Sequence, residues 1–330
     1  MKVFLTHTEE AFSRYYGERA LAALREHTEV VRNRTGRVLE GAALAEAAAG
    51  CQAIIAHRAT PGRAETFAAA PDLVAFLRCA VDISTIDVAA ASAQGVLVTR
   101  ATPGFTDAVA ELALGLMLDL ARGISDAVEA ARAGRAAMPR LGRQLSGATL
   151  GLIGYGRIAQ RLARSAQALG MRVLAYDPHV SDFGEGVTGL PLHGVLAEAD
   201  FAVCLAIASP ETAGMMNART FGILRKGTFF LNLARGELVD EAALEAALDS
   251  GHLAGAALDV GSAPDQVPPP RLARRPDVIA VPHIGGLTRE ATEHQAMDTV
   301  RQVAALAAGR MPEGAVNAEA AHRLERLRRG

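Results

Sequence analysis

The stretch of residues 148–177 reads ATLGLIGYGRIAQRLARSAQALGMRVLAYD, which has the pattern of a strand, a glycine turn, a helix and a second strand. Gly154 at the start of the turn allows a tight bend, and Gly156 lets a pyrophosphate approach the backbone. The third position of the pattern, Ala159, must be small so that helix and strand can pack closely. This order of elements predicts a βαβ unit suited to a dinucleotide.

Two further features of this stretch favour nucleotide binding over a purely structural βαβ turn. The helix that begins near Arg157 would present free N–H groups and the positive end of its dipole to phosphates. Asp177 ends the second strand at about the spacing expected for an acid that binds a ribose. Nearly half of the chain precedes this stretch, so another structural unit is expected before it.

Composition limits the possible function classes. The chain has 330 residues, which is long for a single core and predicts two domains. Half of the residues are hydrophobic and 21% are charged, as in a well-packed α/β protein. Basic residues are spread along the chain and balanced by acids to a net charge of −2, whereas nucleic-acid binding needs a clustered basic excess. We therefore expect no nucleic-acid partner.

The cysteines and the apolar runs indicate a cellular location. Cys51, Cys79 and Cys204 are far apart and form no CxxC motif or Cys/His cluster, so we expect neither a metal site nor a disulfide scaffold. The apolar run within residues 1–8 is too short for a signal peptide, and no uninterrupted apolar stretch reaches membrane-spanning length. These features predict a cytoplasmic protein without a membrane partner.

Strand-like and helix-like runs alternate before the glycine turn, which predicts a parallel sheet with flanking helices. One helix is expected across residues 10–26. The expected strands are residues 3–6, 28–31, 53–56, 75–79 and 96–99.

The second half of the chain repeats this alternation. Strand-like runs after Leu150 make six strands in all, the count expected of a doubly wound dinucleotide domain. Residues 107–120 are apolar nearly all round, which predicts a helix buried on several sides, either crossing between domains or lying in a subunit interface. Thr288 can cap a helix over residues 289–308 that returns to the first domain. The predicted domains are residues 1–100 with 288–330, and residues 101–287.

Two residues at predicted strand ends could perform chemistry. Arg235 could bind a carboxylate in a bidentate pair, although a surface salt bridge is the simpler explanation for a lone arginine. His283 could give or take a proton near neutral pH, although a lone histidine is more often structural. Their occurrence together in one dinucleotide-binding sheet favours a hydride-transfer enzyme whose substrate carries a carboxylate.

The sequence resembles the D-isomer-specific 2-hydroxyacid dehydrogenases, the family that includes phosphoglycerate, glycerate and formate dehydrogenases. The likeness covers about residues 50–317, and it is strongest at residues 102–114, 154–159 with Asp177, 232–240 and 282–288. It implies an α/β protein with two parallel sheets flanked by helices. One sheet would belong to a Rossmann dinucleotide-binding domain and the other to a smaller, discontinuous, flavodoxin-like substrate domain. The resemblance also implies NAD as the cofactor, a small-molecule substrate and a homodimer.

The resemblance assigns roles to individual residues. Arg235 would bind the substrate carboxylate and carbonyl oxygen, and His283 would be the general acid for ketone reduction. The predicted substrate contacts are Ala80, Val81 and Asp82, and no metal is expected. The predicted cofactor contacts are Gly154, Tyr155, Gly156, Arg157, Ile158, Asp177, Ser209, Ala234, Asp259 and Thr106.

The partner of the predicted acid departs from the family pattern. Family members usually place a glutamate that orients the histidine five residues after the position of Asp259, and here that residue is Pro264. Asp265, the nearest acid in sequence, is the predicted catalytic partner of His283. Gln266, or a carboxylate elsewhere in the chain, is the alternative, since formate dehydrogenases use a glutamine in this role.

The predicted substrate loop also departs from the pattern. Ala80 and Asp82 stand where glycines are usual, and Ser84 replaces an aspartate. A carboxylate at Asp82, beside N–H groups that normally cradle a substrate carboxylate, would repel it. We therefore interpret the chain as an NAD-dependent D-2-hydroxyacid dehydrogenase with two alternatives. These are an NAD(H)-sensing binding protein, like the corepressors of this fold, and a dehydrogenase for a non-carboxylate oxyanion such as phosphonate.

Overall fold

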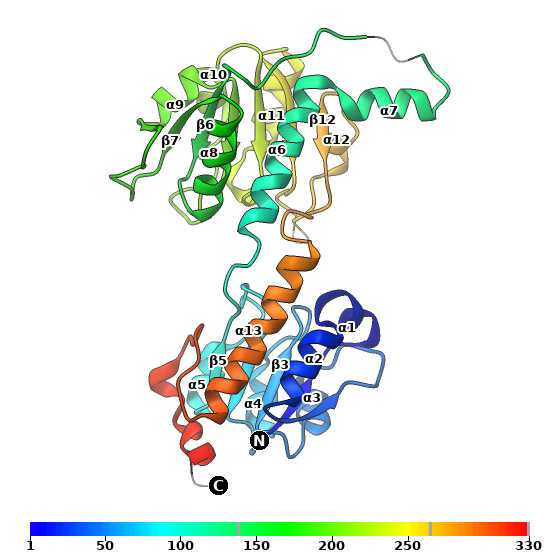
Figure 1. The fold of residues 1–330 in the computed structure, drawn as a ribbon, viewed down its shortest axis with the longest axis vertical. Helices are drawn as coiled ribbons and strands as arrows, with labels where there is room; N and C mark the ends of the chain where they lie inside the picture. Colours follow the sequence, from blue (N-terminus) through cyan, green and yellow to red (C-terminus); the bar gives the residue numbers. More distant parts are fainter. Residues whose placement is uncertain (137–138, 264–265, 329–330) are drawn as a thin grey trace. The chain divides into compact units, whose positions relative to one another are not determined.

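The computed structural model describes residues 1–136, 139–263 and 266–328. The chain divides into two compact units, of which the first joins Met1–Gly104 to Thr288–Gly330 and the second is Phe105–Leu287 (Figure 1). Each unit is built around one parallel sheet with helices packed on both faces. The fold class predicted from the sequence is confirmed.

Within the described residues, the first unit has a five-stranded parallel sheet in the order β2-β1-β3-β4-β5, which is the flavodoxin-like order. Its strands are β1 (Lys2–Leu5), β2 (Glu29–Arg32), β3 (Ala53–Ala56), β4 (Ala75–Arg78) and β5 (Leu97–Thr99). Its helices are α1 (Glu9–Tyr15), α2 (Gly17–Arg25), α3 (Gly41–Ala47), α4 (Ala64–Ala69), α5 (Val88–Ala93) and α13 (Arg289–Ala307), with short 3-10 segments at Ala318–Ala320 and His322–Arg328. All five strands lie close to the predicted positions.

Alternate residues of these strands point to opposite faces of the sheet, and each face has its own core. Leu5, Ile55 and Leu77 pack with α1, α2 and α13. Ile54 and Phe76 pack on the other face with α3, α4 and α5. Because both faces are covered, β1, β3, β4 and β5 are buried and largely apolar, as is typical of parallel strands, whereas the edge strand β2 begins with Glu29 and ends with Arg32.

The single helix expected over residues 10–26 is wrong, because the structure divides it into α1 and α2. Gly17 has a φ of +82°, which a glycine adopts without steric cost, and this breaks the helical path. The break buries Tyr16, whose hydroxyl lies 3.2 Å from Oγ1 of Thr299 on α13. At the other end of the chain, Thr288 caps α13 by accepting the N–H of Ala291, as predicted.

Within the described residues, the second unit has a seven-stranded parallel sheet in the order β12-β11-β10-β9-β6-β7-β8. Its strands are β6 (Thr149–Ile153), β7 (Arg172–Tyr176), β8 (Val187–Gly189), β9 (Phe201–Cys204), β10 (Thr228–Asn232), β11 (Leu253–Leu258) and β12 (Val278–Ala280). Its helices are α6 (Thr106–Arg122), α7 (Ile124–Arg132), α8 (Arg157–Ala168), α9 (Leu192–Glu198), α10 (Ala218–Ile223), α11 (Glu241–Asp249) and α12 (Pro270–Ala273), with a 3-10 turn at Gly236–Leu238. This is the Rossmann order with one added edge strand.

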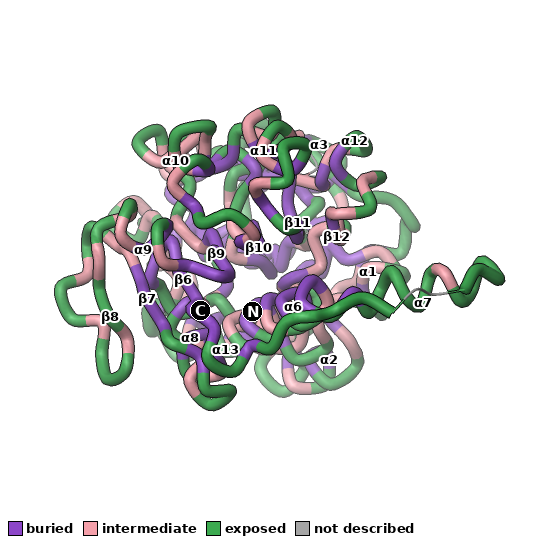
Figure 2. The backbone as a smooth tube through the Cα atoms, turned by 90° about the horizontal axis from the view of Figure 1, so that it is seen from above, coloured by how far each residue is buried: buried purple, intermediate pink, exposed green. Residues whose placement is uncertain are grey.

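The count of six strands is therefore wrong by one, because β8 was missed. This strand is three residues long, lies at the sheet edge and ends in a glycine. Two of its three residues are exposed, so it has none of the apolar pattern that marks the buried strands. Figure 2 shows that β6, β9, β10 and β11 carry most of the buried residues of this sheet.

Helix α6 and helix α8 cover one face of the second sheet, and α9, α10 and α11 cover the other. Within this chain residues 107–120 are buried on one side only, and the expected burial of the other sides in a subunit interface stays a prediction. Val109, Ala113 and Leu116 face the core, whereas Glu111 and Leu118 are exposed. Neither α6 nor any other helix in the described ranges combines the length and hydrophobicity needed to cross a membrane.

Candidate functional site

The glycine turn lies between β6 and α8, at the carboxyl edge of the second sheet. Gly154 has a φ of +90°, and a Cβ there would lie 2.6 Å from the backbone of Ala206, so only glycine fits. Gly156 is the N-cap of α8, and a Cβ there would meet no atom within 4 Å. The approach to the first N–H groups of the helix is therefore open, as a phosphate requires.

Asp177 directly follows β7 and lies beside this turn. Its Oδ2 accepts the backbone N–H of Tyr155 at 2.9 Å, and its Oδ1 accepts that of His179 at 2.9 Å. Arg157 and Ile158 are the first two residues of α8, where backbone N–H groups have no partner inside the helix. The turn, the helix start and the half-buried acid together fit the pyrophosphate and ribose of a dinucleotide.

Three other predicted cofactor contacts also belong to the second unit. Thr106 is the half-buried first residue of α6. Ser209 lies in the connection after β9, and its N–H donates to Oγ1 of Thr212 at 2.8 Å. Ala234 follows β10, and its N–H donates to Oδ1 of Asn232 at 3.1 Å. Since β9 and β10 are neighbours, Ser209 and Ala234 lie in adjacent connections at the carboxyl edge.

Arg235 lies in the turn after β10, with its side chain exposed. The buried Asn232 fixes this turn, because its Nδ2 donates to the carbonyl of Arg235 at 2.9 Å. Gly236 packs closely against Gly261, which lies in the turn after β11. A Cβ on residue 236 would lie 2.0 Å from the backbone of Gly261. The guanidinium donates from Nη1 to the carbonyl of Ala234 at 2.8 Å. A held backbone and an exposed guanidinium suit the binding of a carboxylate.

His283 follows β12 in an unusual backbone conformation. Its φ is +52°, in the left-handed region that non-glycine residues rarely adopt. Asp259, which is 2% exposed, accepts the N–H of Ile284 at 2.7 Å and that of Gly285 at 3.0 Å. These two bonds hold the turn that carries His283.

Asp259 therefore has a positioning role that the sequence did not reveal. Burial raises the pKa of its carboxyl above the usual value, and the bonds from Ile284 and Gly285 oppose that rise, as does the charge of His283. Sequence reasoning assigned Asp259 to the cofactor alone. Because its partners are 25 and 26 residues away along the chain, no local pattern marks them.

The predicted partner of His283 is not placed by the structure, since Pro264 and Asp265 lie outside the described residues. Gln266, one of the alternatives, donates from Nε2 to Oε1 of Glu237 at 3.1 Å. Its own Oε1 is buried and accepts no hydrogen bond within the described ranges. Gln266 thus makes no hydrogen bond to His283 here, and Asp265 stays a prediction.

The predicted substrate loop follows β4 in the first unit. Ala80 is buried, Val81 is half-buried and Asp82 is exposed. The carboxylate oxygens of Asp82 accept the N–H and the hydroxyl of Ser84, each at 2.9 Å. The negative charge of Asp82 also acts on Arg78, the fully buried last residue of β4. The acid that replaces a glycine is therefore engaged within its own loop.

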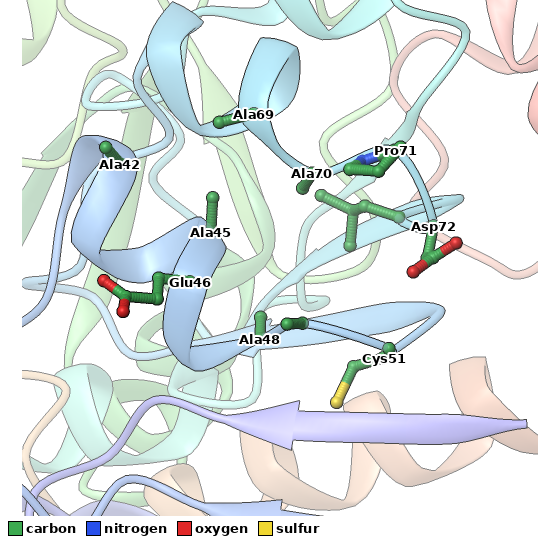
Figure 3. A pocket seen from close by; sticks show the side chains of 12 residues that line it. Ala42, Ala45, Glu46, Ala48, Cys51, Ala69, Ala70, Pro71 and Asp72 are labelled. Carbon is green, nitrogen blue, oxygen red and sulfur yellow. The ribbon is translucent and has the colours of Figure 1, made fainter.

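Two hollows lie apart from these residues. One, of about 350 Å³, lies between α3 and α4, and Figure 3 shows the alanine side chains that line it together with Glu46 and Cys51. It is at the amino ends of β3 and β4, whereas ligands of parallel α/β sheets bind beyond the carboxyl ends. The other, of about 760 Å³, lies between α8 and residues 182–187. Neither hollow is lined by Arg235 or His283.

A metal centre is not evident in the part of the chain that the structure describes. Residues 1–136, 139–263 and 266–328 hold no group of three or more His, Cys, Asp or Glu side chains arranged to bind a metal ion.

The second unit matches a known family. Residues 114–285 match the family model of the D-isomer specific 2-hydroxyacid dehydrogenase, NAD binding domain. The chain belongs to this family. The resemblance inferred from the sequence is confirmed, and the second unit of this dehydrogenase family member is an NAD-binding domain.

Among its relatives are D-3-phosphoglycerate dehydrogenases. That of Pongo abelii is 36% identical over 277 residues, which cover 82% of this chain and 51% of the relative. That of Mycobacterium bovis is 36% identical over 269 residues, which cover 80% of this chain and 51% of the relative. The chain spans about half the length of the curated relatives it matches.

Solved structures resemble the whole chain. The TT0316 protein from Thermus thermophilus superposes with a TM-score of 0.82 at 34% identity, covering 96% of this chain and 100% of that one. D-lactate dehydrogenase from Lactobacillus jensenii, solved with NAD⁺, gives a TM-score of 0.83 at 25% identity, covering 96% of this chain and 99% of that one. Both units of this family member thus have counterparts in single solved chains.

Proposed function

We propose that the chain is an NAD-dependent D-2-hydroxyacid dehydrogenase in which the first unit is the substrate domain. The observation that carries this proposal is the position of Arg235 and His283. They follow β10 and β12, which both neighbour β11, in the sheet whose carboxyl edge also holds the glycine turn and Asp177. A carboxylate-binding group, a proton donor and a dinucleotide turn on one edge match hydride transfer to a 2-keto acid.

The residues would divide the chemistry among them. NAD(H) supplies or accepts the hydride when bound. Arg235 binds the substrate carboxylate in a bidentate pair. His283 donates a proton to the carbonyl oxygen during reduction and takes it from the hydroxyl during oxidation, while Asp259 keeps the histidine turn in place. Reduction thus consumes the keto acid, NADH and a proton, and yields the hydroxy acid and NAD⁺.

The other predicted contacts remain part of this proposal. Asp265 is the proposed partner of His283, and Ala80, Val81 and Asp82 are proposed substrate contacts of the first unit. The proposed cofactor contacts are Gly154, Tyr155, Gly156, Arg157, Ile158, Asp177, Ser209, Ala234, Asp259 and Thr106.

The test is NADH oxidation over a panel of 2-keto acids, with phosphonate-bearing analogues in a parallel series. Turnover of at least one keto acid supports the proposal. Tight NADH binding without turnover of any compound would instead favour the NAD(H)-sensing binding protein, which the departures at Ala80 and Asp82 also favour. Turnover of the phosphonates alone would point to a non-carboxylate substrate.

We also propose a cytoplasmic homodimer. Helix α7 has no buried residue, and Figure 1 shows it extending away from the sheet of its unit. Leu118, Ile124 and Val128 are each more than 40% exposed on α6 and α7, and such apolar surface is typical of a subunit interface. The three cysteines are buried free thiols, which suits a reducing compartment. Light scattering of the parent and of an Ile124→Lys, Val128→Lys variant tests the dimer.

A further inference from the structure

Glu241 is the first residue of α11, and its side chain bonds to the loop that follows β11. The side chain is 13% exposed, and its Oε1 accepts both the backbone N–H and the hydroxyl of Ser262, each at 2.9 Å. Its Oε2 accepts from Nη2 of Arg271 at 2.7 Å. A carboxylate withdrawn from water is costly unless it is hydrogen-bonded, so these contacts hold Glu241 and Ser262 in one arrangement.

The N–H of Ser262 belongs to the peptide that packs against the turn of Arg235. A Cβ on Gly236 would lie 2.0 Å from the carbonyl of Gly261 and 2.3 Å from the nitrogen of Ser262. The residue that directly follows Arg235 therefore lies on the peptide that Glu241 holds.

The loop after β11 is held at a second point as well. Gln266 donates from Nε2 to Oε1 of Glu237 at 3.1 Å, and its carbonyl accepts the N–H of Gly261 at 3.0 Å. Glu237 and Glu241 both belong to the segment that follows Arg235, two and six residues along the chain. The loop and this segment thus brace each other.

The side chain of Arg235 depends on this support. In the part of the chain that the structure describes, its guanidinium makes one hydrogen bond, to the carbonyl of Ala234 at 2.8 Å, and no ion pair. The direction of the guanidinium is therefore set mainly by the backbone of its turn. A misplacement of about 1 Å in a group that binds substrate can cost about 10²-fold in rate, even when its cause lies away from the reacting atoms.

We propose that Glu241 is a positioning residue for Arg235, acting through Ser262 and the close packing of Gly261 on Gly236. This role rests on the proposed dehydrogenase function, in which Arg235 binds the substrate carboxylate, and it involves the second unit alone. The alternative is that Glu241 only stabilises the fold, by joining α11 to the loop and to Arg271 of α12.

Two substitutions of Glu241 and a matched control test this, with NADH and the keto acid that turns over fastest. Glu241→Ala should lower kcat/KM about tenfold, mainly through a higher KM for the keto acid, and leave NADH affinity unchanged. Glu241→Gln keeps an oxygen acceptor for Ser262 and should stay within about threefold of the parent. Glu245→Ala is the control, because Glu245 lies on the same helix and pairs with the same Arg271 at 2.8 Å. It should leave kcat/KM unchanged.

A double-mutant cycle with Arg235 separates positioning from general support of the fold. If Glu241 acts through Arg235, Glu241→Ala should change kcat/KM by less than about twofold in an Arg235→Ala background. A residue that merely supports the fold would lower kcat/KM by the same factor in both backgrounds, since independent effects on the free energy add.

Ser262→Ala keeps the test intact if Glu241→Ala does not fold. It removes the hydroxyl donor and retains the N–H, so we expect a fall in kcat/KM of about threefold, which the Arg235→Ala background should again abolish. Amide hydrogen exchange of the peptide that contains Gly261 and Ser262 should be faster in Glu241→Ala than in Glu245→Ala.

The outcomes separate the two proposals. An unchanged kcat/KM in Glu241→Ala, or a loss of the same size in the Arg235→Ala background, overturns the positioning role and leaves the dehydrogenase function standing. The absence of turnover with every keto acid overturns the dehydrogenase function and the positioning role with it.

Discussion

At the carboxyl edge of the second sheet, side chains hold the backbone turns through hydrogen bonds. At the carboxyl edge of the first sheet, by contrast, buried imidazole nitrogens have no hydrogen-bond partner within the described ranges. Asn232 bonds the carbonyl of Arg235, Asp259 bonds the turn after His283, and Asp177 bonds the glycine turn. His7 has no hydrogen bond from its ring within the described ranges. The second edge is preorganised to hold reacting groups, while the first buries imidazole nitrogens that have no hydrogen-bond partner in the described ranges.

The largest effect is expected when the two side chains proposed for catalysis, Arg235 and His283, are removed from the carboxyl edge of the second sheet. Arg235→Ala and His283→Ala should each lower kcat/KM for the best keto acid by at least about 10²-fold, because in the proposed reaction both act in the transition state. NADH affinity, measured by fluorescence titration, should change little. The matched controls are Arg219→Ala and His193→Ala, two residues of the same unit that lie outside the proposed site. Near-normal turnover of His283→Ala would remove its catalytic assignment.

A second prediction sharpens the interpretation of the glycine turn. The carboxylate of Asp177 should bind ribose hydroxyls and repel the 2′-phosphate of NADP, so the enzyme should prefer NADH. Asp177→Ala should shift the ratio of kcat/KM for NADH over NADPH by about tenfold or more towards NADPH. Arg172→Ala is the control, since Arg172 begins β7 and pairs with Glu198 at 2.7 Å. An unchanged preference in Asp177→Ala would contradict the assignment.

The sequence predicted the elements whose signals are local. The glycine turn, the helix after it and the acid that ends β7 form one continuous pattern. Apolar runs mark the strands of the two sheets other than the edge strands β2 and β8, of which β2 has two valines and β8 is short and largely exposed. Strand ends follow from the strands, so Arg235 and His283 could be placed at one edge of the sheet from the sequence alone.

The contacts that position those residues could not be predicted in this way. The bond of Asp259 to Ile284 joins residues 25 apart, and the left-handed φ of His283 has no glycine or asparagine to mark it. His7 and His57 meet only because β1 and β3 pair in register, and that pairing is a property of the sheet rather than of any window of sequence. The break at Tyr16 was missed because the residues on both sides favour helix.

The third prediction concerns how folding stability depends on pH through His57, at the carboxyl edge of the first sheet. His57 has a pKa lowered to about 4, chiefly by burial and then by the charges of Arg58 and Arg78, while an exposed histidine titrates near 6.5. Between these values the unfolded chain binds a proton that the folded chain does not. The contribution of neutral His57 to the free energy of unfolding is therefore fully present above about pH 6.5 and is lost as the pH falls towards 4.

The groups around His57 determine which comparison isolates its contribution. Burial also lowers the pKa of the neighbouring His7, as do the charges of His57 and Arg32. Tyr15 and Tyr16, whose rings contact these histidines, carry no charge near neutral pH. Thermal unfolding at pH 7.5 and pH 5 should show a smaller acid-induced loss in His57→Leu than in the parent, with His27→Leu as the control. An equal acid-induced loss of thermal stability in the parent, His57→Leu and His27→Leu would show that His57 does not contribute to it.

The smallest effect is expected at Asp82, where the first edge departs most plainly from its family. If the carboxylate faced the substrate, Asp82→Gly should improve small keto acids such as pyruvate. The carboxylate is instead exposed and accepts two hydrogen bonds from Ser84, so its charge is screened by solvent. We expect kcat/KM for pyruvate to change by less than about threefold, in keeping with the small effect of exposed charges.

Asp82→Asn separates the charge from the turn, because it keeps a side-chain acceptor for Ser84. An improvement of tenfold or more in both variants would mean that the charge opposes the substrate, whereas an improvement in Asp82→Gly alone would mean that the backbone of the loop limits activity.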